Sequence, residues 1–170
     1  SAAATRSIKP RLMASDTLTV SDLLHLALMK SINAAAVALA EEVAGSEVMT
    51  STLIENFLHS YAPDKLLTHL GGYGIAAVYE GKHPGPTVMI RCELDGLPVE
   101  EADKNQWLVP GANIAHRCGH DGHMAIVAGL APLLHRTPPS CGRVVLLFQP
   151  AEETGAGARA IIDDPNFEKV

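Results

Sequence analysis

The chain has 170 residues, of which 47% are apolar, 4% aromatic and 19% charged, and its formal net charge is −6. This length is enough for one well-cored domain and short for two. The 13 basic residues are scattered, so the chain lacks the basic surface and the aromatic platforms that bind nucleic acid. No segment approaches the ~20 apolar residues of a membrane span. We therefore expect neither nucleic acid nor a membrane as a partner.

The three cysteines, Cys92, Cys118 and Cys141, form no CxxC pair and no even-numbered framework. This usage is typical of free thiols in a reducing compartment. The first thirty residues show no secretory signal pattern. We expect a cytoplasmic protein, with Cys92 and Cys141 as core thiols.

The N-terminal part is expected to be helical after a flexible arm at 1–15. Apolar residues recur at three- and four-residue spacing over 16–42, which predicts a long, largely buried helix. The sequence Thr52-Leu-Ile-Glu55 fits a capping box that opens a second helix, which should end before Pro63.

The pattern then changes to strands. Glycine-bounded 73–79 and the run 87–92 predict two neighbouring strands, and the continuous apolar run 142–148 predicts a strand buried on both faces. Between them, 95–106 is turn-rich, and 121–135 predicts a helix that Pro132 should kink or end early. This alternation predicts an α/β layer architecture.

The stretch 116–123, HRCGHDGH, has the first concentration of chemically active side chains. Thiolate and imidazole are preferred ligands of zinc and similar divalent ions. Gly119 permits the sharp backbone that lets Cys118 and His120 converge on one ion, so we expect both in a loop, with a helix starting near Asp121. His123 could then point back toward the site. A loop with a free thiol and surface histidines is the alternative.

Acidic residues follow two of the predicted strands. Glu152 and Glu153 come directly after 142–148, where α/β sheets usually place their sites, and one could bind an ion while the other handles a proton. Asp95 follows 87–92 and could fix the tautomer of a ligand imidazole, as could Glu93. The alternatives are a solvated glutamate pair and a simple Asp-Gly turn.

Three motifs in order, RCELDGLP, HRCGHDGH and GRVVLLFQPAEETGAGA, resemble those of the metal-dependent amidohydrolases. This group includes aminoacylases, hippurate hydrolases and indole-acetyl-amino-acid hydrolases, which are relatives of glutamate carboxypeptidase. The resemblance covers roughly 71–168 and is loose before about 65. It implies a three-layer α/β/α zinc-peptidase-like catalytic domain, with a mixed sheet and helices on both faces.

The resemblance also implies residue roles. Cys118, His120 and Glu153 would be metal ligands, Glu152 the general acid/base, and Asp95 a residue that orients a ligand. Glu93 stands where the family more often has Asp, and it stays unassigned together with His116 and His123.

The implied reaction is hydrolysis of small amides such as N-acyl amino acids, with water activated by a divalent ion and deprotonated by Glu152. Zinc, manganese, nickel and cobalt all fit, and the thiolate favours zinc.

The family's further histidine ligands and its lid or dimerisation domain would follow Val170. Residues 16–170 would therefore be the N-terminal portion of the catalytic domain, inactive by itself and inclined to form homo-oligomers through exposed apolar surface. Two other functions stay open: a thiol amidase with Cys118 as nucleophile, and a non-catalytic metal-binding or interaction module.

Overall fold

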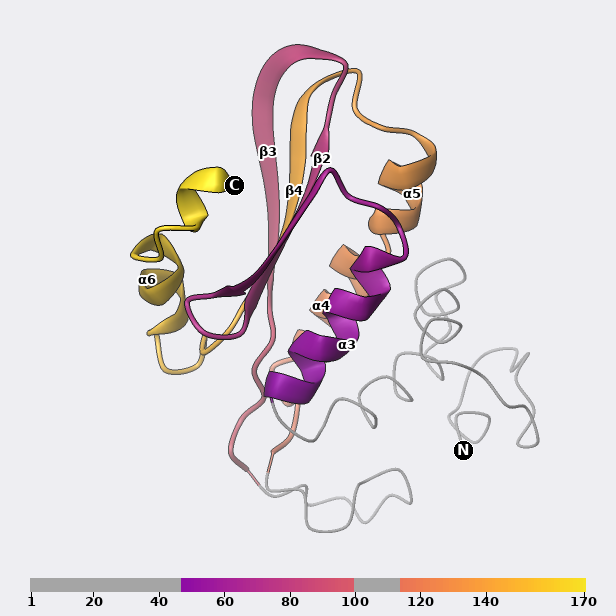
Figure 1. Cartoon of the computed structure of the whole chain (residues 1–170). Coiled ribbons are helices and arrows are strands. Elements are labelled where there is room, and N and C mark those ends of the chain that lie inside the picture. The colour runs from indigo at the N-terminus through magenta and orange to yellow at the C-terminus, as the bar shows by residue number, and fades with distance from the viewer. Residues whose placement is uncertain (1–46, 100–113) are drawn as a thin grey trace, which may run out of the picture.

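The computed structural model describes residues 47–99 and 114–170 (Figure 1). The predicted arm at 1–15, the predicted helix at 16–42 and most of the turn-rich segment 95–106 lie outside these ranges. The described helices and strands are α3 (Glu47–His59), β1 (Lys65–Leu70), β2 (Gly74–Glu80), β3 (His83–Glu93), α4 (His120–Ala128), α5 (Ala131–Arg136), β4 (Cys141–Gln149), α6 (Gly157–Ile162) and the 3-10 turn η2 (Phe167–Lys169).

The four described strands form one mixed sheet in the order β1-β2-β4-β3. The pairs β1/β2 and β2/β4 are antiparallel, whereas β3 and β4 are parallel. β4 is central, and its apolar run becomes fully buried from Val145 to Gln149. The prediction of a mixed sheet around this strand is confirmed.

Helices cover both faces of the sheet, as the sequence predicted: α3, α4 and α5 lie on one side and α6 on the other (Figure 1). β2 shows why, because its side chains alternate between the two faces. Ile75 and Ala77 pack with the apolar residues of α3 and α4, whereas Ala76 and Val78 pack with Ile161 of α6. Two separate apolar clusters therefore sandwich the sheet.

The second predicted helix exists, but its predicted start is wrong. α3 begins at Glu47, five residues before Thr52, and ends at His59, before Pro63 as expected. The Thr52 hydroxyl donates to the carbonyl oxygen of Val48, one turn back, at 2.9 Å. A threonine inside a helix can bond in this way, so Thr52 and Glu55 do not form a capping box.

The predicted helix 121–135 is two helices, α4 and α5, separated at Gly129 and Leu130. Pro132 lies in the first turn of α5, where its missing N–H costs nothing. The regular part thus ends before the proline, as predicted.

The sheet is larger than the sequence indicated. β1 was not predicted, and β3 begins at His83 within the predicted turn, with an irregular register between His83 and Thr87. Pro84 and Pro86 are tolerated there because β3 is an edge strand among those described. Within the two described ranges, no helix combines the length and hydropathy of a membrane crossing.

Candidate metal and catalytic site

Two parallel strands bring the acidic motifs to one edge of the sheet. Glu93, at the end of β3, is paired with Gln149, at the end of β4. The backbone N–H of Leu94 continues this pairing by donating to the carbonyl oxygen of Gln149 at 2.7 Å. Since the strands run in the same direction, Asp95 and the pair Glu152/Glu153 emerge side by side.

A tight turn before α4 delivers the sulfur and imidazole ligands. Gly119 is in the left-handed conformation, with φ 80°, as a glycine readily adopts. His120 is the first residue of α4 rather than part of the loop, and its side chain is buried, whereas Cys118 is exposed. Ligand atoms of Cys118, His120 and Glu153 all lie within 4.8 Å of one another. The structure thus brings together the three predicted ligands.

Glu152 and Glu153 both approach the same imidazole. The Nε2 atom of His120 lies 3.8 Å from Glu152 Oε2 and 3.8 Å from Glu153 Oε1. One imidazole nitrogen therefore faces two carboxylates, with the thiol of Cys118 nearby.

Asp95 contacts both parts of the site, but through atoms other than those expected. Its backbone carbonyl oxygen, rather than its carboxylate, lies 2.7 Å from His120 Nδ1 and accepts a hydrogen bond from that ring nitrogen. Its Oδ2 atom accepts a hydrogen bond of 2.8 Å from the backbone N–H of Glu153. The buried Oδ1 atom has no hydrogen-bond partner and lies 3.5 Å from His120 Nδ1. Asp95 thus links the imidazole to the glutamate loop.

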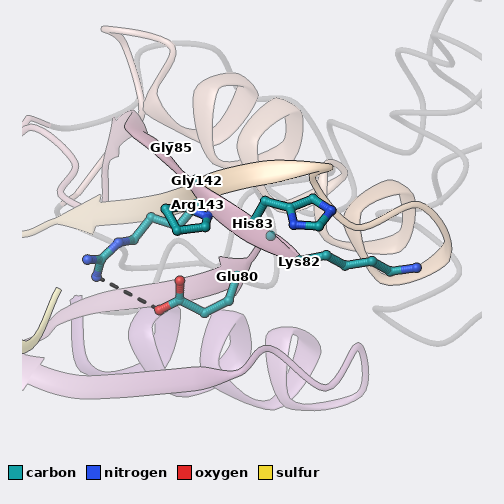
Figure 2. Close-up of a pocket in the computed structure, with 8 residues that line it drawn as sticks. Glu80, Lys82, His83, Gly85, Gly142 and Arg143 are labelled. Carbon is teal, nitrogen blue, oxygen red and sulfur yellow. Dashed lines mark ion pairs between the residues drawn. The ribbon is translucent and has the colours of Figure 1, made fainter.

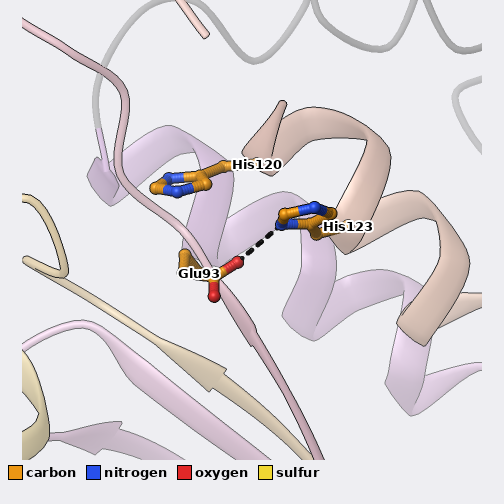
Figure 3. Close-up of side chains that lie close together, drawn as sticks. All are labelled: Glu93, His120 and His123. Atoms are coloured by element: carbon orange, nitrogen blue, oxygen red, sulfur yellow. Dashed lines mark hydrogen bonds and ion pairs between the residues drawn. The ribbon is translucent and has the colours of Figure 1, made fainter. Parts of the chain in front are cut away.

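A second group, Glu93, His120 and His123, shares the His120 imidazole with the first (Figure 3). His123 points back from the first turn of α4, as predicted, and its Nδ1 is 2.8 Å from Glu93 Oε2. The guanidinium of Arg91 is paired with the other Glu93 oxygen. Burial would raise the pKa of Glu93, but the hydrogen bond from His123 and the charge of Arg91 outweigh it and lower that pKa. Glu93 is thus neutralised by protein groups.

The first group, by contrast, suits a cation. The pKa of Cys118 is raised, chiefly because its thiol donates to the Glu153 carboxylate, with partial loss of solvent around the thiol and the charges of Glu153, Glu152 and Asp95 adding to the effect. A thiol, an imidazole nitrogen and clustered carboxylates with a buried unpartnered oxygen form a donor set that a divalent ion would neutralise. The residues present therefore fit a divalent ion.

His116, Cys92 and Cys141, which the sequence analysis also considered, belong to neither of these two groups. Burial lowers the pKa of His116, and its Nδ1 has no hydrogen-bond partner among the described residues. Cys92 is a buried core thiol, as predicted. The same prediction for Cys141 is wrong, because it is exposed at the first residue of β4.

A pocket of about 420 Å³ lies elsewhere, at the turn between β2 and β3 and the start of β4 (Figure 2). Glu80 lines it and pairs with Arg143, with 3.9 Å between Glu80 Oε1 and Arg143 Nη1. Lys82 and His83 also line it. The pocket is at the opposite end of β4 from Glu152, and its lining includes none of Cys118, His120 and Glu153.

A mixed sheet between two helical layers carries a thiol, imidazole and carboxylate group at its edge, which is the arrangement of an α/β/α domain. Residues 89–170 match the sequence model described as peptidase family M20/M25/M40. The resemblance identified from the three motifs is thereby confirmed.

Individual relatives agree with this assignment. N-acetylcysteine deacetylase of Bacillus subtilis is 34% identical over 72% of this chain and 32% of its own length. IAA-amino acid hydrolase ILR1-like 6 of Arabidopsis thaliana is 42% identical over 50% of this chain and 18% of its own length. The Bacillus subtilis YXEP protein, described as a dinuclear metal binding peptidase from the M20 family, matches in structure with a TM-score of 0.66 at 32% identity, over 75% of this chain and 36% of its own. The chain spans a third or less of the curated relatives described here.

A second family model, described as D-alanyl-D-alanine carboxypeptidase, matches residues 2–59. The deacetylase match, at 72% of the chain, is too long to fit after residue 59 and so reaches into the same span. Most of α3 lies within that shared span.

Proposed function

We propose that this chain contributes the water-activating half of a metal-dependent hydrolase that cleaves amide bonds of N-acyl amino acids or related small amides. The observation that carries the proposal is the convergence of Cys118, His120 and Glu153 within 4.8 Å, with Glu152 beside them. Three protein ligands with a neighbouring carboxylate are the usual composition of a catalytic metal site.

In this proposal each side chain has a distinct task. Cys118, His120 through Nε2, and Glu153 would hold the ion, which when bound supplies Lewis-acid polarisation of the scissile carbonyl and a lower pKa for water. Glu152 takes the proton of the attacking water at its carboxylate and delivers it to the leaving amine. Asp95 keeps the proton on His120 Nδ1, so Nε2 stays a ligand.

The relatives support the substrate class, since they are named as an N-acetylcysteine deacetylase and an IAA-amino acid hydrolase. Zinc is the proposed ion because of the thiolate, with manganese, nickel and cobalt as the other candidates. A reduced Cys118 requires a reducing compartment, which favours a cytoplasmic location.

The cysteine nucleophile alternative is opposed by the electrostatics of the site. An activated cysteine needs positive surroundings that lower its pKa, whereas carboxylates surround Cys118 and its pKa is raised. The non-catalytic module differs from the proposal only in the absence of turnover.

The test has two stages. The 170-residue chain should bind one equivalent of zinc at Cys118, His120 and Glu153, and Cys118→Ser should abolish tight binding. Residues 47–170 should then replace the corresponding segment of the Bacillus deacetylase, and the hybrid should release amine from N-acetyl amino acids, lose activity with EDTA and regain it with metal.

In that hybrid, Glu152→Gln should retain the ion but lose about a hundredfold or more in rate, because the general base is missing. Activity that resists EDTA but is destroyed by thiol alkylation would favour the thiol amidase. A folded, metal-loaded hybrid without turnover would favour the non-catalytic module.

The isolated chain is proposed to be inactive and to form homo-oligomers. Robust hydrolysis by the 170 residues alone would contradict the first of these statements.

A further inference from the structure

The loop after β4 has an unfavourable backbone conformation at the residue just before the two glutamates. Ala151 has φ 49°, in the left-handed region that residues other than glycine seldom occupy. Such a conformation persists only where surrounding contacts enforce it. The position of Glu152 and Glu153 therefore depends on what holds Ala151.

The group that holds it comes from the far end of the described chain. Oε1 of Glu47, the first residue of α3, accepts a hydrogen bond of 2.7 Å from the backbone N–H of Ala151. The backbone N–H of Glu153 donates to Asp95 Oδ2 at 2.8 Å. Glu152 thus lies between two amides, each bound by a carboxylate from another element.

The loop also closes on itself, which limits how it can move. The backbone N–H of Gly157 donates to the carbonyl oxygen of Ala151 at 3.1 Å. A side chain at Gly157 would collide with the carbonyl oxygen of Pro150. The Ala151 peptide is therefore held from both sides, by Glu47 at its N–H and by Gly157 at its carbonyl oxygen.

Glu47 is itself firmly placed. α3 is anchored by the buried side chains of Ile54, Phe57 and Leu58, and the Ser51 hydroxyl donates to the carbonyl oxygen of Tyr73 at 2.8 Å. A carboxylate in the first turn of a helix is also stabilised by the helix dipole. A hydrogen bond to a charged acceptor from such a rigid element is among the stronger ones.

We propose that Glu47 is a positioning residue, which holds the strained Ala151 peptide and thereby places the Glu152 and Glu153 carboxylates toward His120. The inference rests on the proposed function for the roles of these two glutamates. It also assigns α3 to the hydrolase site, although residues 2–59 match the model of another peptidase family.

The test replaces Glu47, in the whole 170-residue chain, by two side chains of nearly the same length as glutamate. Glu47→Gln keeps an oxygen that can accept the Ala151 N–H, whereas Glu47→Met removes the acceptor and retains the bulk. Glu55→Ala, which removes a different carboxylate from the same helix, is the control. If Glu47→Met does not fold, Glu47→Asp, whose carboxylate is one methylene short, takes its place.

The first measurement needs no metal. Amide hydrogen exchange at Ala151, followed by NMR, should be about tenfold faster or more in Glu47→Met than in the wild type, because a bond to a charged acceptor is lost. Glu47→Gln should exchange within a few-fold of the wild type, and Glu55→Ala should be unchanged. Equal exchange in Glu47→Met and the wild type would overturn the proposal, as would exchange in Glu47→Gln as fast as in Glu47→Met.

The second measurement is titration with cobalt(II), read from the thiolate-to-metal absorption of Cys118. The dissociation constant should rise about tenfold in Glu47→Met, as for a residue that supports metal ligands indirectly, and Glu47→Gln should restore it. Unchanged affinity in Glu47→Met would contradict the positioning role. If the wild type binds no cobalt, the proposed function fails, while the exchange result still decides the role of Glu47.

Discussion

The Nδ1 atom of His120 lies 2.7 Å from the backbone carbonyl oxygen of Asp95. A carbonyl oxygen can only accept, so Nδ1 carries a proton, and Nε2, on the side of Glu152 and Glu153, is the nitrogen left to bind a metal ion. The backbone at residue 95 therefore determines which imidazole nitrogen is available as a ligand. The Asp95 side chain has a separate task, because its Oδ2 holds the N–H of Glu153.

The two tasks of Asp95 can be separated by substitution. Asp95→Ala keeps the carbonyl oxygen but leaves the N–H of Glu153 without an acceptor, so zinc affinity should fall about 10- to 100-fold. Asp95→Asn retains an oxygen for that N–H and should lose much less. Competition with a chromophoric chelator measures both. Equal affinity of Asp95→Ala and the wild type would show that Oδ2 does not support Glu153.

Metal binding should strengthen as the pH rises. The hydrogen bond from the Cys118 thiol to Glu153, followed by partial loss of solvent and nearby carboxylates, raises the pKa of Cys118, so near neutral pH the thiol is protonated. Binding must displace that proton, and the apparent affinity should therefore rise by up to about tenfold per pH unit until the pH reaches the thiol pKa.

Calorimetry in buffers of different ionisation enthalpy should count the released proton. Cys118→Ser should bind more weakly and show a shallower dependence on pH over the same range. A pH-independent affinity in the wild type would mean that the thiol is not displaced by the ion.

How far the sequence could predict this site depends on how local each signal is. The apolar run of β4 and the three motifs lie in short stretches, and they led to the central strand and to the three side chains that now lie within 4.8 Å. The role of the Asp95 backbone could not be predicted, because side-chain chemistry suggested the carboxylate. Glu47 and Ala151 are 104 residues apart, and no local pattern connects them.

The sequence analysis missed the strand β1 and placed the start of α3 wrongly, and each error has a physical cause. β1 escaped prediction because it lies at an edge of the described sheet and its residues before Leu70 are exposed or partly buried, so its sequence shows no clear alternation of apolar and polar residues. The pattern Thr-x-x-Glu at Thr52 also fits a helix interior, where the hydroxyl bonds one turn back.

Asp164 should contribute stability that acid removes. Its Oδ2 and Oδ1 atoms accept hydrogen bonds from the backbone N–H groups of Gly71, at 3.0 Å, and Asn166, at 2.8 Å. These bonds lower the pKa of Asp164 below its ordinary value of 3.8. A carboxyl group with a lowered folded-state pKa stabilises the protein fully above its unfolded-state pKa and loses this effect as the pH falls through the folded-state value.

Asp164→Asn should therefore lower the midpoint of thermal unfolding by a few degrees at neutral pH, and the difference from the wild type should shrink as the pH falls below about 4. Asp163→Asn is the control, since Asp163 is exposed and its ion pair with Arg159 lies on the surface. Thermal melts at a series of pH values measure both. A difference that stays constant down to pH 2 would rule out the carboxylate as its source.

The last prediction concerns the edge of β3 that no other described strand pairs with. Among the described strands β3 pairs only with β4, and Val88 and Met89 on it are 51% and 41% exposed. An exposed apolar edge strand is a template for pairing with another chain. The two prolines near its start, Pro84 and Pro86, cannot donate hydrogen bonds and should confine pairing to the part after them.

The chain should accordingly self-associate in a concentration-dependent way through β3. Val88→Lys should shift it toward the monomer in sedimentation velocity, because a charged side chain on an edge strand opposes edge-to-edge pairing. Ile126→Lys is the matched control, since Ile126 is an equally apolar residue, 62% exposed, on α4. If Ile126→Lys dissociates the chain and Val88→Lys does not, the association uses the helical face rather than the strand edge.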